Sequence, residues 1–219
     1  MVWGCIIGMS ADDVLKLWDK EWTDFSNVHE SGSPVGKWLH KQRMVIIRKM
    51  LLSINSDSTT IDIGCGGGET LKLLRDCGFK NSIGIDFSEH AIDKAKQFGF
   101  VKDKDIFLID GKDTKYPNRH FKFVFSEGLW EHFEDPTPFM DEACRIADEW
   151  LMIIQPDHFS FFGGLLHWGW SKFSKKGVFE YSFKLEWFTS YVKNLGFDLY
   201  AKKSTLLNEQ SVLLYRRKN

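Results

Sequence analysis

The chain has 219 residues, of which 43% are hydrophobic and 27% are charged. This composition is typical of a globular protein with one full domain, with or without an appendage, and argues against intrinsic disorder. The 29 basic and 30 acidic side chains leave a net charge of -1, which gives no overall electrostatic reason to expect a nucleic-acid partner. No apolar run approaches the ~20 residues of a membrane-spanning helix.

The four cysteines stand far apart along the chain and form no CxxC pair. We therefore expect neither a disulfide framework nor a zinc site, and no other metal site is predicted. Reduced thiols indicate a cytoplasmic protein. Residues 1–9 are apolar but lack the basic start and the small-residue cleavage site of a signal peptide, so none is predicted.

Hydrophobic periodicity and turn residues divide the chain into alternating helical and extended segments. Helices are expected at residues 11–22, 35–52, 69–77, 88–98, 138–147 and 185–195. Strands are expected at residues 59–63, 82–85, 105–109, 121–125, 150–154, 197–201 and 211–215. Strands separated by helices indicate parallel pairing, whereas the last two strands have no helix between them and must pair antiparallel if they are neighbours. The sequence predicts an α/β fold with a doubly wound, mostly parallel seven-stranded sheet and a C-terminal antiparallel hairpin.

A glycine-rich turn follows the first predicted strand, in the segment Asp62-Ile-Gly-Cys-Gly-Gly-Gly68. Glycines there allow positive φ and let a ligand lie against bare backbone, and the next helix directs its N–H groups at the turn. A triphosphate-binding loop would need Lys followed by Ser or Thr after the last glycine. A dinucleotide fingerprint would need glycine in place of Glu69, whose carboxylate would repel a pyrophosphate.

Asp86 ends the second predicted strand, 22 residues after Gly64. An acidic side chain at this place can accept hydrogen bonds from two ribose hydroxyls. It could instead only cap the helix that begins near Ser88. Together with the turn, Asp86 favours a nucleoside that carries a ribose and no phosphate.

Three segments together carry a resemblance to a known family. They are Asp62-Ile-Gly-Cys-Gly-Gly-Gly68, Gly84-Ile-Asp-Phe-Ser88 and Phe121-Lys-Phe-Val-Phe125, with Glu131-His132 just beyond the third. In this combination the chain resembles the class I S-adenosylmethionine-dependent methyltransferases, most closely their small-molecule, type 11-like group. The resemblance implies a Rossmann-like fold and S-adenosylmethionine (SAM) as cofactor. It also implies a SAM-binding domain at residues 58–219, preceded by an N-terminal helical cap at residues 1–57.

The resemblance further implies which residues contact SAM. They are Asp62, Gly64, Cys65, Gly66, Gly68, Asp86, Phe87, Asp110, Gly111 and Ser126. The turn would face the methionyl and ribose parts, Asp62 the amino group, and Asp86 the ribose diol. Phe87 would pack against adenine, and Asp110 and Gly111 would meet its amine and ring. Two simpler interpretations stay open: Asp110-Gly111 is also a favoured turn dipeptide, and the Cys65 side chain could only pack in the turn.

Methyl transfer from a sulfonium is an in-line displacement, and it needs a base only if the acceptor loses a proton early. The candidates for that base, in falling order, are His132, Glu127, His158 and His167. Glu127 ends the fourth strand beside the expected methyl position, and Glu131-His132 is expected to begin a helix that faces the site. His132 could instead be only a packing or orienting residue. Away from the site, Glu142 and Arg145 are expected to form a surface ion pair on one helix.

The acceptor is predicted to be small and hydrophobic or aromatic, even lipid-like. The segment Ser126-Glu-Gly-Leu-Trp130 lacks the Asn/Asp-Pro-Pro-aromatic motif of enzymes that methylate amino groups of bases or glutamine. No Pro-Cys pair for attack on a pyrimidine carbon occurs there either, and base flipping would want a basic channel that is not evident.

An aromatic segment at residues 158–170, within an insertion at about 157–184, is predicted to form an apolar lid over the acceptor. The alternatives are a hydrophobic cap on the sheet, a contact in a homodimer and, less favoured, contact of the aromatic residues and following lysines with an anionic membrane surface. Two rival functions also stay open. One is a non-catalytic SAM-binding subunit that acts with a partner, and the other is an NAD-linked oxidoreductase with a degenerate turn.

Overall fold

The computed structural model describes residues 16–17, 34–161, 164–165 and 180–218 of the chain. The predicted helix at residues 11–22, apart from residues 16 and 17, lies outside these described residues. So do His167 and most of the predicted lid. Within the described part, helices and strands follow one another in the predicted order.

The described residues form the following elements. The α-helices are α2 (Pro34–Leu51), α3 (Glu69–Asp76), α4 (Glu89–Gln97), α5 (Thr137–Ile146) and α7 (Leu185–Asn194). The strands are β1 (Thr60–Ile63), β2 (Ser82–Asp86), β3 (Ile106–Leu108), β4 (Phe121–Glu127), β5 (Ala147–Pro156), β6 (Phe197–Ser204) and β7 (Gln210–Arg217). Two short 3-10 turns are η1 (Asp103–Asp105) and η2 (Trp130–His132).

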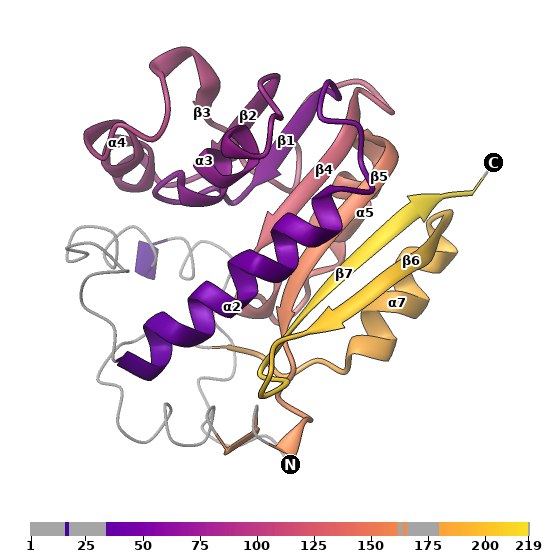
Figure 1. The fold of residues 1–219 in the computed structure, drawn as a ribbon. Helices are drawn as coiled ribbons and strands as arrows, with labels where there is room; N and C mark the ends of the chain where they lie inside the picture. Colours follow the sequence, from indigo (N-terminus) through magenta and orange to yellow (C-terminus); the bar gives the residue numbers. More distant parts are fainter. Residues whose placement is uncertain (1–15, 18–33, 162–163, 166–179, 219) are drawn as a thin grey trace.

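The strands join in one seven-stranded sheet with the order β3-β2-β1-β4-β5-β7-β6 (Figure 1). The pairs from β3 through β5 are parallel, and β7 lies antiparallel between β5 and β6. This arrangement confirms the predicted doubly wound sheet with its C-terminal hairpin. The strand order reverses between β1 and β4, and in open α/β sheets ligands bind outside the carboxyl ends of the strands at this point.

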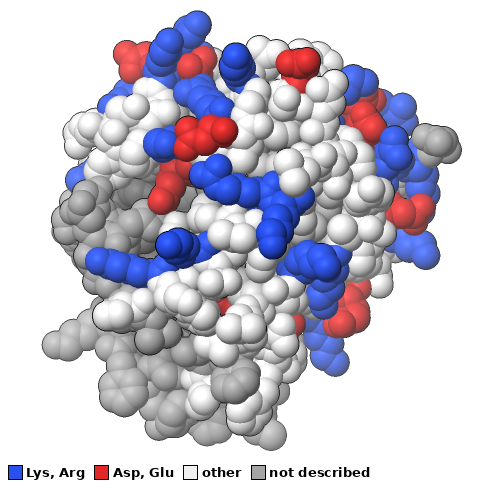
Figure 2. Space-filling model, in the orientation of Figure 1, with Lys and Arg blue, Asp and Glu red and all other residues white. Residues whose placement is uncertain are grey.

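Helices α2, α3 and α4 cover one face of the sheet. Ile47 of α2, Leu71 of α3 and Ile92 of α4 belong to one buried cluster with Phe123 of β4. In Figure 1, α2 crosses in front of the strands, and Figure 2 shows basic and acidic side chains interspersed over this face. Helix α2 therefore shares a core with the sheet. A division of the chain into two parts at residue 57 stays a prediction.

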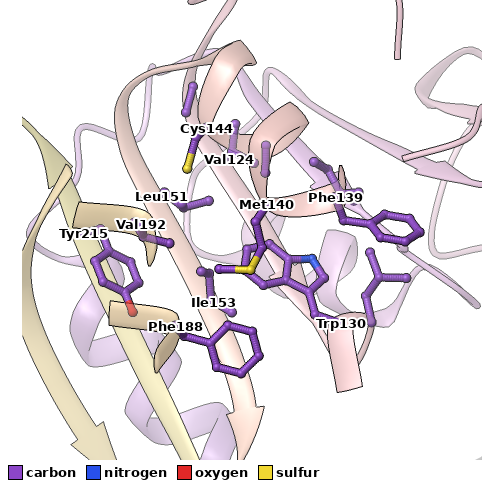
Figure 3. Close-up of a cluster of buried hydrophobic side chains, with 14 of the residues drawn as sticks. Val124, Trp130, Phe139, Met140, Cys144, Leu151, Ile153, Phe188, Val192 and Tyr215 are labelled. Carbon is purple, nitrogen blue, oxygen red and sulfur yellow. The ribbon is translucent and has the colours of Figure 1, made fainter. Parts of the chain in front are cut away.

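Helices α5 and α7 cover the opposite face. Met140 of α5 and Phe188 of α7 join Trp130 and Val124 in a second buried cluster (Figure 3). Val124 follows Phe123 directly, so the two side chains point to opposite faces of the sheet, as neighbouring residues of a strand do. Burying each such side chain stabilises the fold by about 1.5–3 kcal/mol. These two cores fix β4, whose end carries Glu127.

The helix expected to begin at Glu131-His132 is absent from the described residues, so this prediction is wrong. His132 ends the single turn η2, and α5 begins only at Thr137. The reason lies in Asp135 and Pro136: a residue before proline avoids the α-helical conformation. The Asp135 Oδ1 atom accepts a hydrogen bond of 3.0 Å from the Thr137 backbone N–H, which favours a turn there.

Candidate active site

The glycine turn between β1 and α3 has the backbone conformation that its sequence predicts. Gly64, Gly66 and Gly68 have φ values of 74°, 48° and 78°, in the left-handed region that side chains other than glycine rarely adopt. The N–H groups of Gly64 and Cys65 both donate to the Ile85 carbonyl, at 2.9 and 3.0 Å. The turn is thereby fixed to the end of β2.

Asp86 is buried beside this turn. Its Oδ2 atom accepts a hydrogen bond of 2.9 Å from the Gly66 N–H, and Oδ1 accepts one of 3.0 Å from the Ser88 N–H. Ser88 is the N-cap of α4, because its hydroxyl accepts from the Ala91 N–H at 3.1 Å. The helix is thus capped by Ser88, and the carboxylate of Asp86 is held at the turn.

Three carboxyl groups gather at the carboxyl ends of neighbouring strands. Asp62 of β1 is 1% exposed, and its Oδ2 atom has no hydrogen-bond partner within the structure as described. Burial, followed by the negative charges of Glu127 and Asp86, raises the pKa of Asp62 well above its ordinary value. This end of the sheet is therefore an acidic site that lacks a positive charge next to Asp62.

Helix α2 reaches the same end of the sheet. The Arg43 guanidinium Nε lies 2.5 Å from Glu127 Oε1, and its Nη1 donates to Gln210 Oε1 at 2.6 Å. Thr70 of α3 donates its hydroxyl hydrogen to Glu127 Oε2 at 3.0 Å. His40, one turn before Arg43, has its Nε2 atom 3.6 Å from Glu69 Oε1. No motif in the sequence connects residues 40 and 43 with the site.

The structure brings other predicted site residues to the same region in packing roles. The Ser126 hydroxyl donates to the Ile63 carbonyl at 3.1 Å and joins β4 to β1. A Cβ on Gly84 would lie 2.7 Å from the Cys65 Sγ atom, so the thiol packs tightly on β2. Burial, followed by the charges of Asp86 and Asp62, raises the pKa of Cys65, and the group stays a thiol at neutral pH.

Asp110 and Gly111 follow β3. The Asp110 Oδ1 atom accepts a hydrogen bond of 2.9 Å from the Lys112 N–H, as in the turn that their sequence also favours. A Cβ on Gly111 would lie 2.8 Å from the Ile63 Cγ2 atom, so glycine is needed for close packing against β1. Phe87 is half-buried at the end of β2. Contacts of these three residues with adenine stay predictions.

The candidate bases have different surroundings. His132 is buried in η2, and Glu127 is held by Arg43. The ring of His158 lies between Ser182 Oγ, at 2.9 Å from Nδ1, and Glu180 Oε2, at 3.2 Å from Nε2. His167 lies outside the described residues.

The sequence motifs indicate no separate role for Glu131 beyond its place next to His132. Burial, followed by the charge of Glu180, raises its pKa to about 8, so its carboxyl group is largely uncharged at neutral pH. A buried glutamate after a strand end has no sequence signal beyond its place in the chain. In the described part of the chain, no cluster of three or more His, Cys, Asp or Glu could hold a metal ion. None of the described helices has the length and apolar character to cross a membrane.

A family model for a methyltransferase domain matches residues 37–202, most of the chain. The chain belongs to this methyltransferase family. The match runs from α2 to β6 and includes the glycine turn, Asp86 and the end of β4. It confirms the family predicted from the motifs of β1, β2 and β4.

Part of the chain is also similar in sequence to individual methyltransferases. It is 30% identical over 112 residues to the chloroplast 2-methyl-6-phytyl-1,4-hydroquinone methyltransferase of Arabidopsis thaliana. The aligned segment covers 51% of this chain and 33% of that protein. The chain spans about a third of the length of the plant proteins of this name from Arabidopsis thaliana and Spinacia oleracea.

Solved structures show the same fold at lower sequence identity. Magnesium protoporphyrin IX methyltransferase from Synechocystis PCC 6803, with bound SAH, is 16% identical and superimposes with a TM-score of 0.69, covering 93% of this chain and 94% of that one. A SAM-dependent methyltransferase from Thermotoga maritima, described as a possible histamine N-methyltransferase, is 16% identical with a TM-score of 0.65, covering 93% and 99%.

Proposed function

We propose that this chain is a SAM-dependent methyltransferase that acts on a small, hydrophobic or aromatic acceptor. The observation that carries the proposal is the acidic site at the ends of β1, β2 and β4. There the buried Asp62 Oδ2 atom has no hydrogen-bond partner in the described structure, and Glu127 and Asp86 add negative charge. A site of this kind favours a positively charged ligand.

The residues of the site fit SAM. When bound, SAM supplies a methyl group on a positively charged sulfonium, together with an ammonium group and an adenosine. Asp62 would hold the ammonium group, which would offset the burial of its carboxylate. Asp86, already oriented by the Gly66 N–H, would accept from the ribose hydroxyls with its remaining lone pairs. The bare backbone of the turn leaves room for the ligand at Gly66.

The chain's own contribution to methyl transfer would be mainly alignment. Holding two reactants in a near-attack geometry can lower the barrier by roughly 7–11 kcal/mol. The turn and Asp86 would fix the donor, since hydrogen bonds join the turn to Ile85 and Asp86 at the end of β2. The end of β4 and η2 would form the wall on the acceptor side, where Trp130 is fully buried. Water excluded by this wall would not compete with the acceptor.

The acceptor class is supported by the apolar character of this end of the sheet. Phe159 and Phe161 are exposed just after β5, and Trp130, the first residue of η2, is fully buried. The Arabidopsis relative is named for a phytyl hydroquinone and the Synechocystis neighbour for a protoporphyrin. Both names denote hydrophobic compounds with an aromatic ring system, in line with a hydrophobic or lipid-like aromatic acceptor for this chain. Residues 166–170, on which the dimer and membrane alternatives also rest, lie outside the described part.

The rival functions are less well supported. A pyrophosphate would be repelled by Glu69, which stands where a dinucleotide-binding turn has glycine, and this disfavours an NAD-linked oxidoreductase. A non-catalytic SAM-binding subunit would bind the same ligand but transfer no methyl group. Binding and transfer must therefore be measured separately.

The test begins with calorimetric titration of the chain with SAM, SAH and NADH. We expect SAM and SAH to bind and NADH not to bind. Asp86→Asn should weaken SAM binding about 10- to 150-fold, the value of a hydrogen bond to a charged group. Asp93→Asn, an exposed position on α4, is the matched control and should bind as the wild type does. Binding of NADH alone would refute the proposal.

Methyl transfer is then followed with methyl-labelled SAM and a panel of phenols, amines, thiols and carboxylic acids. Label in any product supports an enzyme. SAM binding without any labelled product, with the panel extended to phytyl- and prenyl-substituted phenols, would favour the non-catalytic subunit instead.

A further inference from the structure

Glu131 lies in η2, just beyond the carboxyl end of β4, on the wall proposed above for the acceptor side. It is 4% exposed, and a Cβ on Gly128 would lie only 3.8 Å from its Oε1 atom. Its carboxyl group is therefore folded back over the residue that follows β4. Its backbone carbonyl accepts a hydrogen bond of 2.6 Å from the Tyr181 N–H, which ties η2 to the segment before α7.

Two polar atoms of η2 lack partners. Neither Glu131 Oε2 nor Trp130 Nε1 has a hydrogen-bond partner within the described structure, although both are buried. Buried polar atoms of native proteins are nearly always hydrogen-bonded, so an exception needs an explanation. One explanation is a ligand that supplies the missing partners.

The charges around Glu131 are mostly negative. Burial is the main cause of its raised pKa, the charges of Glu180 and Glu127 raise the pKa further, and the Gln155 side chain of β5 acts to lower it. His132 is its neighbour in the chain, and the His158 ring contacts Glu180. The positive charge of Arg43 is paired with Glu127. An acceptor that carried a carboxylate at its reacting atom would be repelled here.

We propose that Glu131 binds the nucleophilic group of the acceptor and takes its proton, and that the acceptor is therefore a compound that reacts through an O–H or N–H group. As the new C–O or C–N bond forms, the S–CH3 bond breaks and its electron pair stays on sulfur. The proton that the acceptor loses moves to the Glu131 carboxylate. This inference rests on the proposed function and names the acceptor chemistry of the same site.

Two of the other candidate bases, Glu127 and His158, are already engaged by neighbouring side chains. Glu127 is held by Arg43 and by the Thr70 hydroxyl. The ring of His158 is held between Ser182 and Glu180. Glu131 combines burial at the end of β4 with an oxygen that the described chain does not satisfy.

The first test compares Glu131→Gln with the wild type. Glu134→Gln makes the same substitution at an exposed position three residues along and is the matched control. We expect Glu131→Gln to bind SAM and SAH as the wild type does and to lose at least about 100-fold in kcat/KM with a phenol or an amine. The loss should be smaller for a phenol made more acidic by a nitro group, which needs less help from a base. Equal rates for Glu131→Gln and Glu134→Gln would overturn the proposal.

The pH profile separates a base from a packing residue. For the wild type, kcat/KM should rise with pH through the pKa of Glu131, since only the ionised group accepts the proton. Glu131→Gln should lack this rise, and Glu131→Asp should restore part of it. If kcat/KM of Glu131→Gln rose with pH as the wild type does, another group would cause the rise and the role of Glu131 would be refuted.

A second readout does not depend on turnover. Binding of phenol and amine fragments to the SAH-loaded protein is measured by saturation-transfer NMR, with benzoate as the anionic comparison. We expect phenol or amine binding that Glu131→Leu weakens at least tenfold and Glu134→Gln does not, and no benzoate binding. Preferred binding or methylation of carboxylates would overturn the acceptor class while leaving the proposed function intact. Failure of the wild type to bind SAM would instead refute the proposed function.

Discussion

The Arg43 guanidinium of α2 lies 2.5 Å from the carboxylate of Glu127 at the end of β4. The two side chains are 19% and 14% exposed, so water screens the pair only partly. Arg43 also donates to Gln210, where β7 begins. The first helix of the described chain thus neutralises one of the carboxylates of the active site and joins it to the C-terminal hairpin.

The first prediction concerns this ion pair. Arg43→Ala should lower the free energy of unfolding by about 2–3 kcal/mol, because it leaves the Glu127 carboxylate without its positive partner. Urea unfolding measures the change. Arg48→Ala, on the same helix and 48% exposed, is the control and should change stability by less than about 1 kcal/mol. The double variant Arg43→Ala/Glu127→Gln should recover part of the loss. Equal effects of the two single Arg variants would contradict this account.

The second prediction concerns the glycine turn. Gly68 has φ +78°, and a Cβ there would lie 3.0 Å from Val101 Cγ1 and 3.3 Å from Ala95 Cβ. Gly99 has φ +68°, and a Cβ there would meet nothing within 4 Å. Gly99→Ala should cost only the backbone strain, about 1–2 kcal/mol. Gly68→Ala should cost more in thermal unfolding and should also weaken SAM binding in calorimetry. If Gly68→Ala lowered thermal stability and SAM affinity no more than Gly99→Ala does, the turn would tolerate a side chain.

The third prediction follows from the raised pKa of Glu131. Its pKa rises from 4.5 to about 8 on folding, mainly because of burial. Between these values the unfolded chain releases the proton and the folded chain keeps it, so stability falls as pH rises. Relative to Glu131→Gln, the wild type should lose up to about 5 kcal/mol over this range and no more above it. Chemical unfolding of both proteins from pH 5 to 9 measures the difference, and a constant difference would contradict the prediction.

The fold and the cofactor turn could be predicted because their signals are local. Alternating helices and strands indicate a parallel sheet. The pair of Gly64 and Asp86 belongs to one βαβ unit, whose geometry is fixed by its connection. The hairpin was also predicted, but β6 extends to Ser204 rather than residue 201. Its last residues, Lys202 and Lys203, are exposed and polar, so hydrophobicity could not indicate pairing there.

The parts that escaped prediction depend on contacts between distant segments. Arg43 reaches Glu127 only because α2 packs across the sheet, and nothing in its local sequence shows this. In the sequence, Glu131 is only the neighbour of a histidine. Its burial depends on β5 and on the segment at Tyr181, which are distant along the chain. Position in the strand order is equally non-local: no pattern in the chain places β7 between β5 and β6.

Glu142 shows the same limit. Its pair with Arg145 was predicted at the surface, but Glu142 is buried and joins Arg145 to Thr114 in one junction. Glu142 is 7% exposed, and its Oε1 atom accepts hydrogen bonds from the Thr114 N–H at 2.7 Å and the Thr114 hydroxyl at 2.5 Å. Arg145 donates from Nε to Oε2 at 2.7 Å and from Nη2 to Oε1 at 2.8 Å. The junction holds the loop that begins with Asp110 and Gly111 against α5.

The last prediction concerns this junction, where the pKa shift of Glu142 is opposite in direction to that of Glu131. Burial acts to raise the pKa of Glu142, but hydrogen bonds from Arg145 and Thr114 outweigh it, so the pKa is lowered. A lowered pKa contributes stability above the ordinary value of 4.5 that is lost as pH falls through the folded pKa. Glu142→Gln should therefore be less stable than the wild type at pH 7, and the gap should narrow in acid.

Chemical unfolding of Glu142→Gln between pH 3 and 7 measures this gap, with Glu149→Gln as the control. Glu149 is 41% exposed and pairs with the exposed Arg216, so its removal should change stability little. Glu142→Gln should also weaken SAM binding modestly, since the loop after β3 would be held less firmly. A stability gap that stays constant or widens as the pH falls would mean that the Glu142 carboxylate is not stabilised by its partners in the folded chain.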